Sequence, residues 1–147
     1  KGVHMIDAMV GLAGPIERVH AVSSRKVLSV ADDTTAMLLW FGKGTSGYAA
    51  SLEATGYIWR LAVFGSKGWA EMRGQHNLVV RMNEDGELGE MVKSYEMIDT
   101  LRLEQEAFAD AINGGAPYPM TDEEIIATPA LWEAAIRSAE SGETADI

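Results

Sequence analysis

Apolar residues recur at helical spacing at the beginning of the chain. Val3, Ile6 and Val10 stand three or four positions apart, and Gly14-Pro15 then ends the pattern. Glycine followed by proline is typical of a helix end, because glycine accepts a left-handed backbone and proline cannot continue the helix. The pattern therefore predicts a helix over residues 3–13.

The middle of the chain is rich in strand-forming residues and short connections. The pattern predicts strands over residues 16–24, 34–41, 46–55, 57–64, 69–73, 78–82 and 87–93. The Asp85-Gly86 dipeptide is a strong hairpin signal, and short connections of this kind favour antiparallel pairing. We expect a mainly antiparallel sheet of six to seven strands.

The hydrophobic period changes to about 3.6 in the last third of the chain. It predicts one helix over residues 98–113 and a second over residues 122–141. Thr121 and Glu124 have the spacing of a capping box for the second helix, and Pro129 interrupts that helix or restarts it. A helix, then strands, then two helices predict an α+β domain, with an open sheet that carries the helices on one face.

The other face of the sheet also has apolar residues to bury. If the helices cover one face, either Leu38 and Trp40 or Met37 and Leu39 must point away from them. An exposed apolar face usually marks association, so we predict a homo-oligomer joined through the sheet. The alternative is a sheet that curls around its own core.

Composition and charge narrow the class of protein. The 147 residues fit one domain with a hydrophobic core, and the net charge of −10 argues against a nucleic-acid partner. No apolar run is long enough for a membrane span. The absence of cysteine excludes thiol chemistry and favours a reducing compartment, so we expect a cytoplasmic protein. Because the chain starts at Lys1 with residues that already form a helix, we expect a fragment of a longer protein.

The segment Gly42-Lys43-Gly44-Thr45-Ser46-Gly47 has the glycine spacing of a dinucleotide-binding loop. That loop needs a helix directly after its last glycine and an acidic residue at the end of the next strand. Fewer than ten residues separate Gly47 from Gly56, and the next strand ends in Gly65-Ser66-Lys67. We therefore interpret these glycines as a hairpin turn.

His4 and Asp7 stand three positions apart, so they are neighbours on one face of the first helix. They admit three interpretations: a core histidine paired with a carboxylate, half of a metal site, or an acid–base pair. His20 and His76 have no spacing that would complete a metal site. As an acid–base pair, a neutral imidazole could accept a proton while the carboxylate fixes its tautomer. Arg60 could hold an anionic or hydroxylated substrate, although strand arginines more often reach into solvent.

Seven short motifs, in this order and spacing, resemble the C-terminal domain of the glucose–fructose oxidoreductase / inositol dehydrogenase (Gfo/Idh/MocA) family. They are Gly2-Val3-His4-Met5-Ile6-Asp7, Leu12-x-Gly14, Val19-x-Ala21, Asp33-x-Thr35-Ala36, Val63-Phe64-Gly65-Ser66-Lys67-Gly68, Phe108-x-x-Ala111-Ile112-x-Gly114 and Ala135-Ile136-x-Ser138-Ala139-x-Ser141-Gly142. Together they span nearly the whole chain.

The resemblance implies a two-domain NAD(P)-dependent dehydrogenase of which residues 1–147 are the C-terminal substrate-binding and oligomerisation domain. The N-terminal nucleotide-binding domain, absent here, would hold most of the NAD or NADP. His4 matches the family's catalytic histidine, which takes the proton of a substrate hydroxyl, and Asp7 matches the acidic residue that orients it or binds substrate hydroxyls. The implied substrate is a sugar, polyol or related hydroxy compound, and the implied assembly is a homodimer or homotetramer. The alternative function is a non-catalytic oligomerisation or regulatory scaffold.

Overall fold

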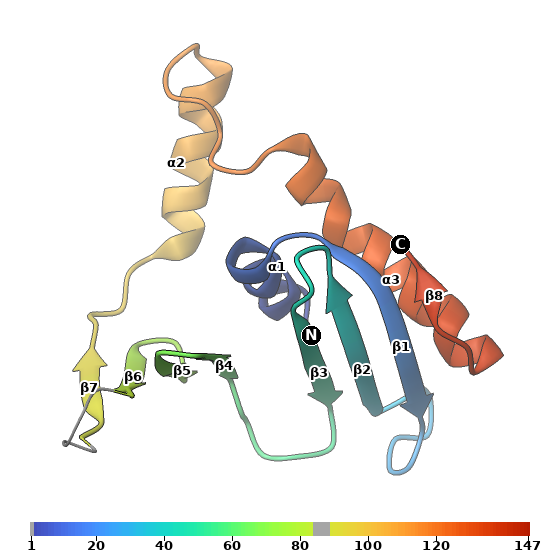
Figure 1. Cartoon of the computed structure of the whole chain (residues 1–147). Helices are drawn as coiled ribbons and strands as arrows, with labels where there is room; N and C mark the ends of the chain where they lie inside the picture. Colours follow the sequence, from blue (N-terminus) through green and yellow to red (C-terminus); the bar gives the residue numbers. More distant parts are fainter. Residues whose placement is uncertain (1, 84–88) are drawn as a thin grey trace. The chain divides into compact units, whose positions relative to one another are not determined.

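The computed structural model describes residues 2–83 and 89–147, so the predicted hairpin at Asp85-Gly86 lies outside the described residues. The chain divides into two compact units (Figure 1). The first unit comprises the chain up to Thr55 together with Pro119–Ile147, and the second comprises Gly56–Tyr118.

The first unit is a sheet with helices on one face. Its elements are α1 (Val3–Ala13), β1 (Ile16–Ser24), β2 (Thr34–Phe41), β3 (Ser46–Leu52), α3 (Asp122–Ser141) and β8 (Ala145–Asp146). The strands lie in the order β3-β2-β1-β8, and every neighbouring pair is antiparallel. In Figure 1 this is the part with the blue helix α1, the blue-to-teal strands and the red helix α3.

Alternation along β1 and β2 decides which residues enter the core of this unit. Val19 is paired with Leu39, and Ala21 with Met37, so all four point to the face that the helices cover. They pack with residues of α1 and α3, and the core cluster consists of Ile6, Ile16, Val19, Ala21, Met37, Leu39, Phe41, Leu131, Ala134 and Ala135. Burying one such large side chain contributes about 1.5–3 kcal/mol to folding.

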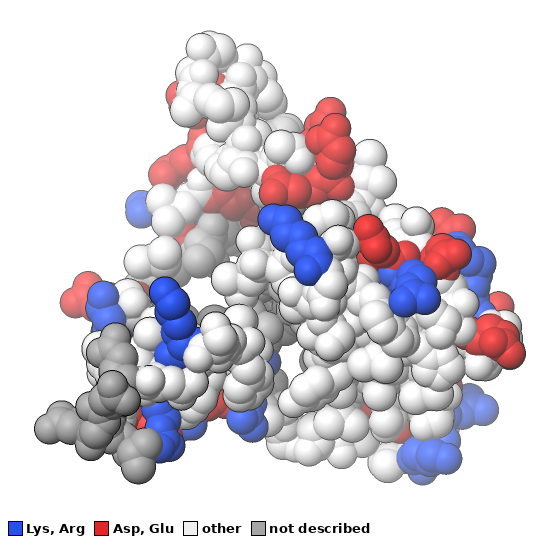
Figure 2. Space-filling view, in the orientation of Figure 1, with Lys and Arg blue, Asp and Glu red and all other residues white. Residues whose placement is uncertain are grey.

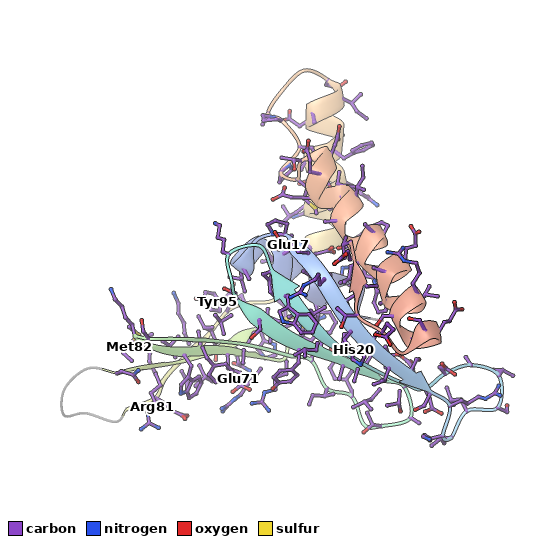
Figure 3. All side chains as sticks on the ribbon, turned by 45° about the vertical axis from the view of Figure 1, so that its right-hand side comes forward. Glu17, His20, Glu71, Arg81, Met82 and Tyr95 are labelled. Atoms are coloured by element: carbon purple, nitrogen blue, oxygen red, sulfur yellow. The ribbon has the colours of Figure 1, made fainter. Side chains whose placement is uncertain are left out.

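The opposite face of this sheet remains open to solvent. Leu38 is 45% exposed and Tyr48 is 80% exposed, and the Arg18 guanidinium lies 5.1 Å from the centre of the Trp40 ring. His20, labelled in Figure 3, alternates with the core residues of β1 and belongs to this same face. Of the two registers that the sequence allowed, the structure therefore has Met37 and Leu39 inside and Leu38 and Trp40 outside.

Helix α3 starts with the predicted capping box. The Glu124 N–H donates to the Thr121 hydroxyl (3.3 Å), and the Thr121 N–H donates to the Glu124 carboxylate (2.8 Å). Pro129 lies inside the helix, which continues unbroken to Ser141, so it neither interrupts nor restarts the helix. Proline removes one helical hydrogen bond, and the burial of Thr128 and Leu131 on either side of it offsets that loss.

The second unit is an antiparallel meander followed by one helix. It contains β4 (Arg60–Gly65), β5 (Gly68–Arg73), β6 (Asn77–Met82), β7 (Met91–Ser94) and α2 (Thr100–Ile112), with the strands in the order β4-β5-β6-β7. A two-residue turn joins β4 to β5 and ends at Gly68, whose φ is 142°. A Cβ on Gly68 would lie only 2.1 Å from the Arg81 carbonyl oxygen, so this position accepts no side chain.

The predicted α+β class and the antiparallel pairing are confirmed, with three differences in detail. The strands form two four-stranded sheets instead of one sheet, because β3 ends at Leu52 and the chain resumes as a strand only at Arg60. Helix α2 has no buried residue, whereas α1 and α3 cover a sheet face. Strand β8 was not predicted, since two residues are too few to show an alternating pattern.

Candidate functional site

The first turn of α1 carries the sequence-predicted pair. The helix is preceded by Gly2, whose φ of 98° favours glycine and whose carbonyl accepts the N–H groups of Met5 (3.1 Å) and Ile6 (3.2 Å). Ile6 is fully buried in the core of the first unit, while His4, on the same turn, is exposed. The buried isoleucine thus fixes a turn whose imidazole faces solvent.

Asp7 is half-buried and held by the neighbouring helix. Its carboxylate accepts a hydrogen bond from the hydroxyl of Thr128, a buried residue of α3. Trp132, one turn further along α3, packs beside the start of α1, where its ring lies 3.5 Å from the position that a Cβ on Gly2 would occupy. Two residues of α3 therefore position the turn that presents His4.

Asp33 is a second carboxylate of the first unit, and its hydrogen bonds hold a loop in place. It accepts backbone N–H groups from Lys26 (2.9 Å), Val27 (2.6 Å) and Leu28 (2.8 Å), and the Thr34 hydroxyl (3.1 Å). These hydrogen bonds, those from Val27 and Leu28 above all, lower the pKa of Asp33 from 3.8 to about 2. Asp33 thus orders the loop between β1 and β2.

Arg60 lies in the second unit, not in the unit that holds His4 and Asp7. It forms an ion pair with Glu71, a buried residue of β5 that also accepts the Arg73 Nε–H at 2.6 Å. Burial raises the pKa of Glu71, but the Arg73 hydrogen bond and the charges of both arginines outweigh it, so this pKa lies below its usual value. Figure 3 labels Glu71 on this sheet.

The glycine-rich segment after β2 is a hairpin turn, as predicted. The Phe41 N–H donates to the Thr45 carbonyl (2.9 Å), and the Gly44 N–H donates to the Phe41 carbonyl (3.0 Å). Strand β3 follows directly, and a dinucleotide-binding loop would need a helix there.

Two further observations concern other kinds of site. Among the described residues, no three His, Asp or Glu side chains are grouped so that they could hold a metal ion, and no helix has the length and hydropathy of a membrane span. On the face drawn in Figure 2, lysine and arginine side chains are interspersed with acidic ones and form no continuous basic surface.

Sequence reasoning missed three residues that these sites use. Thr128 carried no signal, because its partner Asp7 lies 121 positions away in the chain. Glu71 and Arg73 did carry one: they share a face of a predicted strand that otherwise holds apolar residues, and a carboxylate there needs a partner.

The chain is similar to known proteins in part of its sequence and in its fold. Residues 1–71 match the family model of the GFO/IDH/MocA C-terminal domain. A search of curated protein sequences finds no match. Among solved structures with similar folds is a proposed NADPH-dependent oxidoreductase from Desulfitobacterium hafniense, with 24% identity and a TM-score of 0.89 over 99% of this chain and 46% of that one.

Two other similar structures have ligands bound. An aldose-aldose oxidoreductase from Caulobacter crescentus, complexed with glycerol, has 19% identity and a TM-score of 0.82 over 99% of this chain and 46% of that one. A levoglucosan dehydrogenase in complex with NADH and levoglucosan has 18% identity and a TM-score of 0.82, and covers 99% and 48% of the respective chains. This chain thus spans about half the length of each neighbour. The family model over residues 1–71 and the fold over the whole chain confirm the resemblance to the C-terminal domain of Gfo/Idh/MocA oxidoreductases.

Proposed function

We propose that this chain is the substrate-binding and oligomerisation domain of an NAD(P)-dependent oxidoreductase that acts on a sugar, polyol or related hydroxy compound. The observation that carries the proposal is the exposed His4 imidazole, one helical turn from an Asp7 carboxylate that Thr128 holds in place. The similar folds are those of oxidoreductases, and one of them binds NADH and a sugar. The nucleotide-binding domain would be a separate part of the protein.

In the proposed reaction, His4 is the general base. Its neutral imidazole accepts the proton of the substrate hydroxyl, and its solvent-exposed place on the first turn of α1 leaves room for that hydroxyl to approach. Asp7 supports the imidazole or receives a second substrate hydroxyl. A nicotinamide cofactor, when bound, supplies the hydride acceptor, and the described residues contain no dinucleotide loop, so we assign its binding to the other domain.

The test replaces His4 by alanine in the complete two-domain protein. Loss of a general base should lower kcat by roughly 10²–10⁴-fold while the circular dichroism spectrum stays unchanged. The matched control is His76→Ala, an exposed histidine in the turn between β5 and β6, which should keep kcat within about twofold. Equal losses in both variants, or full activity of His4→Ala at neutral pH, would contradict the assignment.

We also propose that the protein forms a homodimer or homotetramer through the open sheet face that bears Leu38, Trp40 and Tyr48. Contiguous exposed apolar surface of this kind is typical of association. Leu38→Glu should convert the oligomer to a monomer in light scattering, whereas Ile136→Glu on the exposed side of α3 should not. A wild-type chain that is monomeric at micromolar concentration would contradict this proposal.

The second candidate function is a non-catalytic scaffold of the same family, which the open apolar face also favours. A complete protein that oligomerises but binds no nicotinamide cofactor would support it over the enzyme. We also propose a cytoplasmic location, which the absence of cysteine supports.

A further inference from the structure

The second unit contains a pocket of its own, with a volume of about 340 Å³. It is lined by Tyr57, Ile58, Trp59, Arg60, Glu71, Arg73 and Gly74, and therefore lies wholly within Gly56–Tyr118. The Gly74 N–H donates to the Trp59 carbonyl at 2.8 Å, which ties the segment before β4 to the turn after β5. The wall of the pocket is thus fixed by a backbone hydrogen bond between two loops.

A buried carboxylate lines this pocket. Glu71 is only 4% exposed, and an ionised carboxylate in such a place is costly unless charged partners surround it. One Glu71 oxygen meets the Nε of Arg60, and the other meets the Nε of Arg73. The two arginines come from adjacent strands at directly paired positions, so one carboxylate orients both side chains.

The two guanidinium groups have donors left for a ligand. A guanidinium has five N–H donors, and the contact with Glu71 engages the single Nε–H of each. The Arg60 side chain is 61% exposed and that of Arg73 is 52% exposed, so the planar ends reach solvent. Two positive charges and one negative charge leave the pocket with a net charge of +1, in a chain whose net charge is −10.

Paired guanidinium groups fit an anion better than a neutral ligand. Their planar forks match the two oxygens of a carboxylate or phosphate and form bidentate, charge-assisted hydrogen bonds. Tyr57 and Trp59 line the same pocket and offer aromatic rings against which the body of a cyclic ligand can pack. The pocket therefore combines an anion-binding end with an aromatic side.

We propose that this pocket binds the anionic group, carboxylate or phosphate, of a sugar acid or sugar phosphate. Arg60 and Arg73 bind the anion, and Glu71 positions both arginines. The choice of a sugar as the body of the ligand rests on the proposed function, whereas the anion-binding pocket requires neither His4 nor a cofactor. The sequence predicted Arg60 as a substrate-binding residue. In this proposal Arg60 acts together with Arg73, and their ligand is an anion.

The first experiment is calorimetric titration of the 147-residue chain with glucuronate, glucose 6-phosphate, inorganic phosphate and neutral glucose. We expect at least one of the two sugar anions to bind at least about tenfold more tightly than glucose, and to weaken as salt is raised. Preference for glucuronate or for glucose 6-phosphate identifies the anion as carboxylate or phosphate. Binding of glucose as tight as that of both sugar anions, or no binding of either, would overturn the proposal.

The second experiment locates the ligand. Arg60→Gln and Arg73→Gln should each weaken binding of the preferred sugar anion about tenfold or more. The matched control is Arg81→Gln, which removes the same charge from β6 on the same face of the sheet and should change the affinity less than twofold. An equal loss in all three variants would show a general charge effect and contradict the assignment.

A third measurement needs no variant and so does not depend on their folding. In ¹H–¹⁵N NMR spectra of the unaltered chain, the anion should shift the Nε–H signals of Arg60 and Arg73 and the amide signal of Gly74. The Nε–H signals of Arg81 and Arg102 should stay in place. Shifts confined to other arginines, or no shift at saturating anion, would overturn the proposal.

Discussion

The two units of this chain bury their side chains in different ways. The first has a continuous cluster of ten buried apolar residues between a sheet and two helices. Among the described residues of the second, the buried side chains are one apolar residue, Val79, and one carboxylate, Glu71. Helix α2 buries none, although Leu101, Phe108 and Ile112 form an apolar stripe on it.

This difference indicates which interactions stabilise each unit. Burial of large apolar side chains is the main favourable contribution to folding, so the first unit carries most of it. The second unit has one buried apolar side chain among its described residues, so strand hydrogen bonds must contribute a larger share of its stability. The apolar core and the pocket with its charged side chains thus lie in separate units of one chain.

The largest expected effect comes from a pair of matched leucines, one in a helix of each unit. Leu131→Ala in α3 removes a fully buried side chain and should lower the free energy of unfolding by about 2–5 kcal/mol. Leu101 in α2 is 63% exposed, so Leu101→Ala should change it by no more than about 0.5 kcal/mol. Urea unfolding followed by circular dichroism measures both, and similar losses would contradict the contrast between the units.

A smaller effect is expected at the link between α1 and α3. Thr128→Val keeps the shape of the side chain but removes the hydroxyl that donates to Asp7, and should cost about 1–3 kcal/mol. Thr128→Ser keeps the hydroxyl and should retain most of that stability. If the serine variant were as unstable as the valine variant, packing and not the hydrogen bond would hold Asp7.

The smallest effect distinguishes the two buried carboxylates. Asp33 is held by backbone N–H groups and Glu71 by two arginines that are more than half exposed. The destabilisation caused by Glu71→Gln should therefore shrink when salt screens the charges, while that caused by Asp33→Asn should not. Thermal unfolding at low and high salt compares the two variants with the wild-type chain.

The Asp33→Asn variant also has a defined pH dependence. The pKa of Asp33 in the folded chain is about 2, below its ordinary value of 3.8. Its contribution to stability is therefore present above about pH 4 and is lost as the pH falls toward 2. The difference in Tm between wild type and Asp33→Asn should accordingly be full at pH 6 and nearly absent at pH 2. A constant difference across this range would contradict the assignment of the carboxylate as the cause.

The hydrophobic pattern of the sequence predicted the individual helices and strands well, and their assembly into sheets less well. The helix over residues 3–13 and the strand over residues 34–41 agree with the structure to the residue, because caps and turn residues such as Pro15 mark their ends. The number of sheets could not be predicted, since pairing between β3 and β4 depends on a connection whose path no local period specifies. For the same reason the alternation in β2 left two registers open, which packing against α3 decides.

For the candidate site as well, contacts within one element could be predicted and contacts between elements could not. His4 and Asp7 were found because their spacing places them on one helical face, and their roles remain predictions. Arg60 was found as an isolated cation, but its neighbours Glu71 and Arg73 required the strand register. Contacts within one element can be read from spacing, whereas contacts between elements need the fold.

Gly68 has a consequence for evolution of the pocket. A side chain there would push β5 away from Arg81 of β6, and if β5 slipped by one position its two faces would be exchanged. Met72 would then be on the face of Arg60, and Glu71 and Arg73 would both turn to the opposite side. The missing side chain at Gly68 therefore helps to keep Glu71 and Arg73 on the same face as Arg60.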